Sequence, residues 1–230
     1  MEIRFATLTT CGAARGVVVV IDVIRAFTTA AFAFKAGAAQ IVPVGGVAEA
    51  LGWRARWPAA LVMGEVNGLP PAGFDFGNSP SALIGQDLRG RRLIQRTGAG
   101  TQGLVRSVSA EVLLAASFVN AAATVNYVQA LGGEAAVTLL PTDHTQDEDQ
   151  ACAEYLAAGL RGAWPDPAPY LERVRAAGRT RIEPGPGDFG WPAWAVRQFE
   201  ADLECCTALN ALAQPMVARR AADYLEVTPA

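Results

Sequence analysis

Short apolar runs alternate with amphipathic stretches through the first two thirds of the chain. Residues 17–23 form a β-branched run that predicts a buried strand, and residues 26–36 place Phe27 and Phe34 among alanines at helical spacing, with Gly37 at the helix end. Further strands are predicted at 41–44, 61–64, 91–95, 111–115 and 135–140, and further helices at 47–56, 120–131, 147–160 and around 194–212. Because strands and helices alternate, the sequence predicts an α/β fold.

The last third of the chain has a different pattern. A proline-rich stretch at 164–169 reads as a stiff connector, and a second cluster of proline and glycine follows at 183–188. We expect this third to be helical in its middle and irregular at its ends. A single domain over residues 1–230 is the preferred organisation, and a second lobe from about residue 161 is the alternative.

Composition and charge exclude several classes of protein. Of the 230 residues, 51% are apolar and 18% charged, which excludes global disorder. The net charge of −3, without long runs of one sign, gives no footprint for nucleic acid. The apolar run at 17–21 is too short to span a bilayer, and residues 1–10 do not resemble a secretory signal, so we expect a cytoplasmic protein with no membrane partner.

The first candidate for chemistry is the segment Asp22-Val23-Ile24-Arg25-Ala26, between a strand and a helix. Ligands of open α/β sheets bind at the carboxyl ends of strands, where Asp22 could hold a divalent cation and Arg25 could bind a phosphate. An ion pair and helix cap without a ligand is the alternative. A phospho-aspartate of the haloacid-dehalogenase type is disfavoured, because Ile24 stands where the second aspartate belongs.

The loop at 64–80 is rich in glycine and proline and long enough to suggest a function. Glu65 and Asp75 supply hard oxygen ligands, and Asn78 or Ser79 can cap a helix opened by Pro80. A capped turn with exposed acids is the alternative.

A third candidate, the turn at 97–103, matches the glycines of a dinucleotide fingerprint. Only about seven residues separate Gly103 from the next predicted strand, which is too short for that unit. Two interpretations of this segment stay open: an anion-binding turn flanked by Arg96, or a plain turn.

A fourth candidate is the acidic segment at 143–149, which also contains His144. It suggests either metal binding or a helix start stabilised by the helix dipole. The spacing excludes an EF-hand. Since His144 is the only histidine, a zinc site with two or three histidines cannot form, and a Ser-His-Asp triad would lack its nucleophile elbow.

Five segments together resemble the 2-phosphosulfolactate phosphatase (ComB) family in order and spacing. They are residues 22–26, 64–65, 73–80, 117–120 and 148–153, and the most specific is Phe74-Asp75-Phe76-Gly77-Asn78-Ser79-Pro80. The resemblance covers roughly residues 17–160. It implies a three-layer α/β/α fold with a mixed sheet, and Mg²⁺-dependent hydrolysis of the phosphate ester of a small 2-hydroxy acid. In the best-known case this is a step towards coenzyme M.

We assign hypothetical roles on this basis. Mg²⁺ is held by Asp22, Glu65 or Asp149 with waters. The catalytic groups are Asp22, Arg25 and Asp75, with Asp75 orienting the attacking water. The substrate-binding groups are Arg96 and the turn residues Gly98, Gly100 and Thr101 for the phosphoryl group, and Asn78, Ser79, Ser117 and Asn120 for the carboxylate or sulfonate end.

One alternative function stays open. The chain has Val66 and Ala99 where the family has an arginine and an asparagine. A non-catalytic protein that binds a phosphorylated metabolite on the same scaffold is therefore the second hypothesis. The apolar surface is compatible with a homodimer.

Overall fold

The computed structural model describes residues 1–132, 136–143, 147–183 and 190–230. The strands are β1 (Ile3–Phe5), β2 (Val17–Ile21), β3 (Gln40–Val44), β4 (Leu61–Gly64), β5 (Arg92–Arg96), β6 (Val112–Ala116), β7 (Val137–Pro141), β8 (Met216–Arg220) and β9 (Leu225–Pro229). The helices are α1 (Ala26–Lys35), α2 (Val47–Arg56), α3 (Gly100–Arg106), α4 (Ala121–Ala130), α5 (Glu148–Leu160), α6 (Ala168–Ile182) and α7 (Ala193–Cys206). His144 and the segment 184–188 lie outside the described residues.

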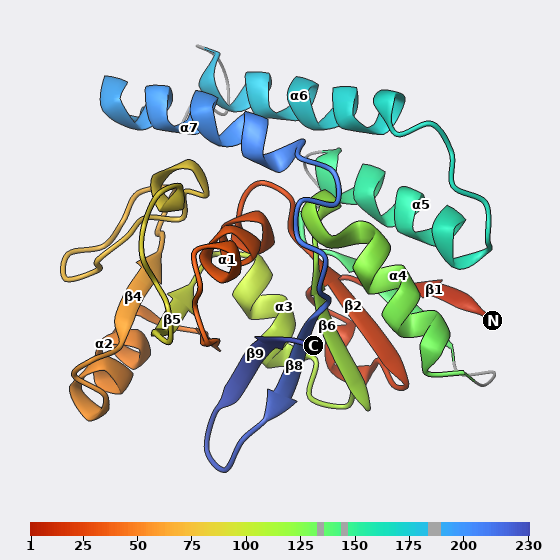
Figure 1. Cartoon of the computed structure of the whole chain (residues 1–230), viewed down its shortest axis with the longest axis horizontal. Coiled ribbons are helices and arrows are strands. Elements are labelled where there is room, and N and C mark those ends of the chain that lie inside the picture. The colour runs from red at the N-terminus through yellow and green to blue at the C-terminus, as the bar shows by residue number, and fades with distance from the viewer. Residues whose placement is uncertain (133–135, 144–146, 184–189) are drawn as a thin grey trace.

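One mixed sheet of nine strands organises these elements, in the order β1-β7-β2-β6-β8-β9-β3-β5-β4 (Figure 1). Neighbours within β1-β7-β2-β6 and within β3-β5-β4 are parallel. The hairpin β8–β9 joins these two blocks through antiparallel pairings. The predicted α/β class with a mixed sheet is confirmed.

Strand β2 shows why the fold has three layers. All five of its residues are buried, and alternate side chains enter different cores. Val18 and Val20 pack in the core that contains α1 and α3, whereas Val17, Val19 and Ile21 pack in the core that contains α4 and α5. A strand covered on both faces reads as a continuous apolar run, which is the pattern of this segment.

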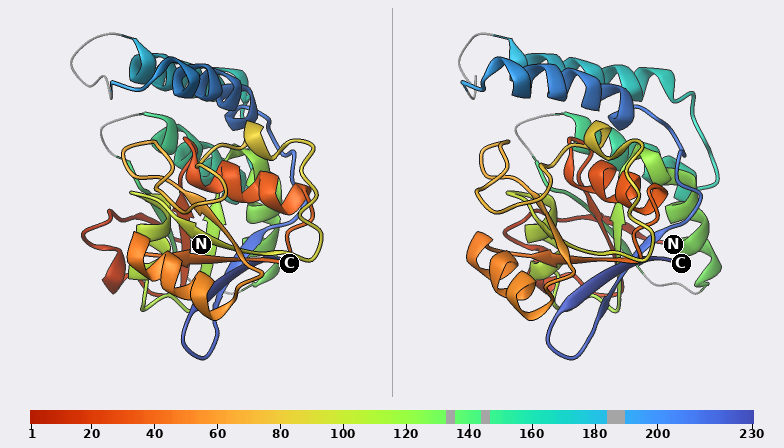
Figure 2. Two further views of the ribbon diagram at one scale, coloured as in Figure 1. Left: turned by 90° about the vertical axis from the view of Figure 1, so that its left-hand side faces the viewer. Right: turned by 60° about the vertical axis from the view of Figure 1, so that its left-hand side comes forward.

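The C-terminal third departs from the prediction in two places. Residues 168–182 belong to the part of this third that we expected to be irregular, but they form the helix α6. This helix lies beside α7 along one side of the molecule (Figures 1 and 2). Residues 216–229, expected to be irregular, form the hairpin at the centre of the sheet. Both segments are partly polar, because α6 is half exposed and β8 ends in two exposed arginines, so their periodicity is weak. No helix within the described ranges is both long and apolar enough to cross a membrane.

Candidate active site

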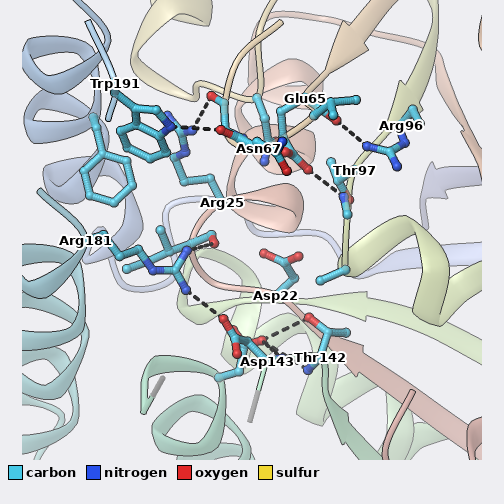
Figure 3. A pocket seen from close by; sticks show the side chains of 18 residues that line it. Asp22, Arg25, Glu65, Asn67, Arg96, Thr97, Thr142, Asp143, Arg181 and Trp191 are labelled. Carbon is cyan, nitrogen blue, oxygen red and sulfur yellow. Dashed lines mark hydrogen bonds and ion pairs between the residues drawn. The ribbon is translucent and has the colours of Figure 1, made fainter. Parts of the chain in front are cut away.

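A cavity of about 280 Å³ opens where several strands end. Asp22 follows β2, Glu65 follows β4, Arg96 ends β5 and Thr142 follows β7, and all four line it. Residues from α6 and α7 close one side of the cavity (Figure 3). Of the residues predicted for the site, those that line this cavity are Asp22, Arg25, Glu65, Asn78, Arg96, Gly98 and Asp149.

The Asp22 carboxylate lies at the centre of this cavity (Figure 3). Its Oδ1 accepts a hydrogen bond of 2.8 Å from the Ala26 amide at the start of α1. Its Oδ2 has no hydrogen-bond donor within the described part of the chain. Burial, and next the negative charge of Asp149, raise the pKa of Asp22 to about 7.

Asp149 is buried, and both its oxygens are engaged. Oδ1 accepts from the Val23 amide at 2.8 Å, and Oδ2 accepts from the Thr142 amide and hydroxyl and from the Asp143 amide at 3.0 to 3.1 Å. Burial and the charge of Glu148 raise the pKa of Asp149 to about 7, although these four donors favour the charged form. Asp149 thus joins the segments that follow β2 and β7.

Glu65 is likewise engaged with backbone. Its Oε2 accepts from the Gly68 amide at 2.8 Å and its Oε1 from the Gly98 amide at 2.5 Å. The Gly98 amide therefore faces a carboxylate, and it is not free to receive an anion in this conformation.

The residues present suit Mg²⁺ better than a metal that needs many protein ligands. Within the described residues, no three histidine, cysteine or acidic side chains form a ready-made metal cluster. Magnesium keeps several waters and binds through one or two carboxylates plus substrate phosphate. Asp22 Oδ2 is a hard oxygen of a buried carboxylate at this cavity, and Glu65 also lines it (Figure 3). These two residues fit such an ion.

Three arginines line the cavity, and they differ in charge environment. Arg25 pairs with Asp202 at 2.7 Å, and Arg181 pairs with Glu148 and Asp143. Arg96 takes part in no ion pair between described residues. Its Nη1 donates to the Glu65 carbonyl at 2.6 Å, and its buried Nε has no acceptor in that part of the chain.

Asn78 carries a second unmatched polar atom. Its side chain is 6% exposed and lines the cavity, and its Oδ1 has no donor within the described residues. A buried acceptor without a partner is unfavourable unless something in the cavity supplies a hydrogen bond.

Asp75 is not among the residues that line the cavity. It lies on the exposed side of the loop, where its Oδ2 accepts from the Val62 amide at 2.8 Å and meets Arg54 at 3.4 Å. This carboxylate fastens the loop to β4 and α2, so the structure does not bring it to the place where a water would be oriented.

Five predicted substrate-binding residues also lie outside the cavity lining. Ser117 and Asn120 form a capping box at a buried turn after β6. The Thr101 hydroxyl donates to the Thr97 carbonyl and accepts from the Thr97 amide, which closes the turn before α3. The Ser79 hydroxyl donates to Asp202 at 2.7 Å. Gly100 is buried against Asp22.

Several cavity residues were missed by the sequence reasoning. Asn67, Arg181, Trp191 and Phe199 line the cavity, and the last three come from the C-terminal third. Arg181 is one of several arginines on a polar helix, so no local pattern distinguishes it. Arg181, Trp191 and Phe199 come to the cavity only because α6 and α7 pack against the rest of the fold.

Most of the cavity residues lie in a region that is similar to a known protein family. A family model described as 2-phosphosulpholactate phosphatase matches residues 5–181. The chain belongs to the 2-phosphosulpholactate phosphatase family. Asp22, Glu65, Arg96 and Asp149 lie within the range that the family model matches, whereas Trp191 and Phe199 lie beyond it.

Relatives in this family come from diverse organisms. Proteins named "Probable 2-phosphosulfolactate phosphatase" are 35% identical over 145 residues in Bacillus subtilis (strain 168) and 41% identical over 146 residues in Carboxydothermus hydrogenoformans. These alignments cover 63% and 62% of this chain, and 64% and 60% of the relatives. A protein of the same name in Thermoplasma volcanium is 29% identical over 84% of this chain and 85% of its own length. The chain thus spans less than two thirds of the first two relatives.

Proposed function

We propose that this protein hydrolyses phosphate monoesters of small 2-hydroxy acids in a Mg²⁺-dependent reaction. Membership of the 2-phosphosulpholactate phosphatase family and the names of its relatives support this class of reaction and a substrate similar to 2-phosphosulfolactate.

One observation carries the proposal: a carboxylate oxygen and an arginine without an acidic partner line the same cavity. The Asp22 carboxylate lines it, and the Arg96 guanidinium has N–H donors, Nε among them, without an acceptor among the described residues. A phosphate monoester with a divalent cation needs these two kinds of group, because its charge must be neutralised while it is held in place.

Asp22 and Glu65 would hold Mg²⁺, which when bound neutralises negative charge on the phosphoryl oxygens. Asp149 then has a positioning role and does not hold the ion itself. The hydrogen bonds that it accepts from Val23, Thr142 and Asp143 fix the segments around Asp22.

Arg96 binds the phosphoryl oxygens through Nε and the remaining Nη hydrogens, and stabilises the charge that develops there. Arg25 offers a second set of N–H donors on the opposite wall, for the carboxylate or sulfonate end. Asn78 Oδ1 accepts a hydrogen bond from a water or hydroxyl in the cavity. We assign no role in water activation to Asp75.

The experiment that tests the proposal is phosphate release from 2-phosphosulfolactate, 2-phospholactate and a phosphomonoester without a carboxylate, with Mg²⁺ and with chelator. Release that the chelator abolishes supports the hydrolase and ranks its substrates. Binding of the same esters without release, measured by calorimetry, supports the non-catalytic phosphometabolite-binding protein instead. Reversion at Val66 and Ala99 then tests whether those positions caused the loss.

A further inference from the structure

A carboxylate of α7 links Arg25, which lines the cavity, to the turn at residues 79–81. Asp202 is fully buried, with 0% of its surface exposed. Its Oδ2 accepts from Arg25 Nη1 at 2.7 Å. Its Oδ1 accepts from the Ser79 hydroxyl at 2.7 Å and from the Ser81 amide and hydroxyl at 2.9 and 2.6 Å. Asp202 itself does not line the cavity, but Arg25 and Asn78, the neighbour of Ser79, do.

The Arg25 guanidinium is confined on its other sides as well. It lies 4.9 Å from the ring centroid of Phe199 and 5.6 Å from that of Trp191, and its Nη2 donates to the Gly68 carbonyl at 3.3 Å. The Trp191 indole donates to the Asn67 carbonyl at 2.8 Å (Figure 3). Aromatic contacts and two anchored nitrogens leave this side chain little freedom.

A buried ion pair is a weak explanation for stability, because desolvation of both charges offsets much of their attraction. The pair with Asp202 does, however, fix the position of the Arg25 guanidinium. A guanidinium has five N–H donors, and the bonds to Asp202 and Gly68 leave others available to a ligand in the cavity.

We propose that Asp202 is a positioning residue, which fixes Arg25 and the turn at Ser79–Ser81 so that the cavity is preorganised for an anionic ligand. This inference rests on the proposed function insofar as that ligand is a phosphate ester. Asp202, Trp191 and Phe199 all lie beyond residue 181, where the match to the family model ends. The C-terminal helix is therefore a component of the site that the matched region does not contain.

The test compares D202N with wild type in binding of inorganic phosphate, measured by calorimetry in the presence of Mg²⁺, and in KM and kcat for the best ester. The amide keeps the size of the side chain but holds Arg25 and the turn less firmly, and this loss of geometry should outweigh the gain in net positive charge. We therefore expect phosphate affinity to fall roughly 10- to 100-fold, with KM rising more than kcat falls. D223N removes a carboxylate that pairs with Arg56 at 2.8 Å on the surface, and should leave both measurements unchanged. S81A removes one donor to Asp202 but keeps the Arg25 bond, so its effect should be smaller than that of D202N.

A double variant separates positioning from a general loss of structure. R25M/D202N removes both buried charges together, so it keeps the test open if D202N alone does not fold. If Asp202 acts mainly through Arg25, the double variant binds phosphate nearly as weakly as R25M alone, with a further loss no larger than that of S81A. Additive losses would overturn the proposal, as would wild-type phosphate affinity in a folded D202N or in the double variant.

The outcomes also separate this inference from the proposed function. If wild type binds phosphate but releases none from any ester, hydrolysis is wrong, and the binding comparison still decides the role of Asp202. If wild type releases phosphate from an ester but binds inorganic phosphate too weakly to measure, the KM comparison decides the role of Asp202. If wild type neither binds phosphate nor releases it from any ester, both proposals are wrong.

Discussion

Asp22 and Gly100 approach so closely that a Cβ atom on residue 100 would lie 2.7 Å from Asp22 Oδ2. The same atom would lie 2.7 Å from the Cβ of Ala26. The turn after β5 therefore packs against the carboxylate at the end of β2, and only glycine leaves that oxygen in its place. Gly100, which we first expected to bind the phosphoryl group, is instead required by this contact.

The first prediction concerns that contact. G100A should lower the free energy of unfolding by about 1–3 kcal/mol through overpacking and should reduce phosphate release, because Asp22 must move. Thermal melts and kinetics measure the two effects. G52A is the matched control: a Cβ there meets nothing within 4 Å in α2, so it should be neutral or slightly stabilising. Unchanged activity in G100A would show that the position of Asp22 Oδ2 is not critical.

Removal of the Asp22 charge should strongly lower turnover. D22N keeps the oxygen that accepts from Ala26 but loses the negative charge at the cavity. We therefore expect metal-dependent phosphate release to fall by about 10²- to 10³-fold, the size typical for loss of one strong electrostatic contact in a site. D87N, which removes an exposed carboxylate paired with Arg89, should retain full activity. A D22N protein with wild-type activity would refute the role of Asp22.

D22N, which should lower activity, should raise the free energy of unfolding of the metal-free protein. The folded pKa of Asp22, about 7, lies above its unfolded value near 3.8, so the folded state binds the proton more tightly and stability falls as pH rises from about 4 to 7. With chelator present, D22N should be more stable than wild type above pH 7, by up to about 4 kcal/mol, and the gain should shrink toward pH 4. Urea unfolding at several pH values measures it. A gain that does not depend on pH would contradict the raised pKa.

Arg96 should contribute mainly to binding. R96M removes the one cavity arginine without an ion pair among the described residues, so we expect KM for the ester to rise roughly 10- to 100-fold, as for loss of a hydrogen bond to a charged group. R96K should recover part of the loss, because it restores the charge without Nε. R89M, at an exposed arginine, is the control. Equal kinetics for R96M and R89M would remove Arg96 from the site.

Local patterns in the sequence determined most of the elements and the centre of the site. Each strand from β2 to β7 was predicted within one or two residues, because an apolar run between polar junctions is recognisable without its partners. Parallel strands bring their carboxyl ends to one edge, so Asp22, Glu65 and Arg96 could be expected near one another.

Contacts between distant segments decided the rest. The strands of the hairpin β8–β9 acquire their role only by insertion between β6 and β3, and the periodicity of their residues does not reveal that position. Likewise Ser117 and Asn120 resemble ligands in sequence, but their side chains satisfy backbone groups at a buried turn. Arg25 meets Asp202 across 177 positions of the chain. A side chain's orientation is set by what packs against it, and for this cavity those neighbours come from helices that only the folded chain brings there.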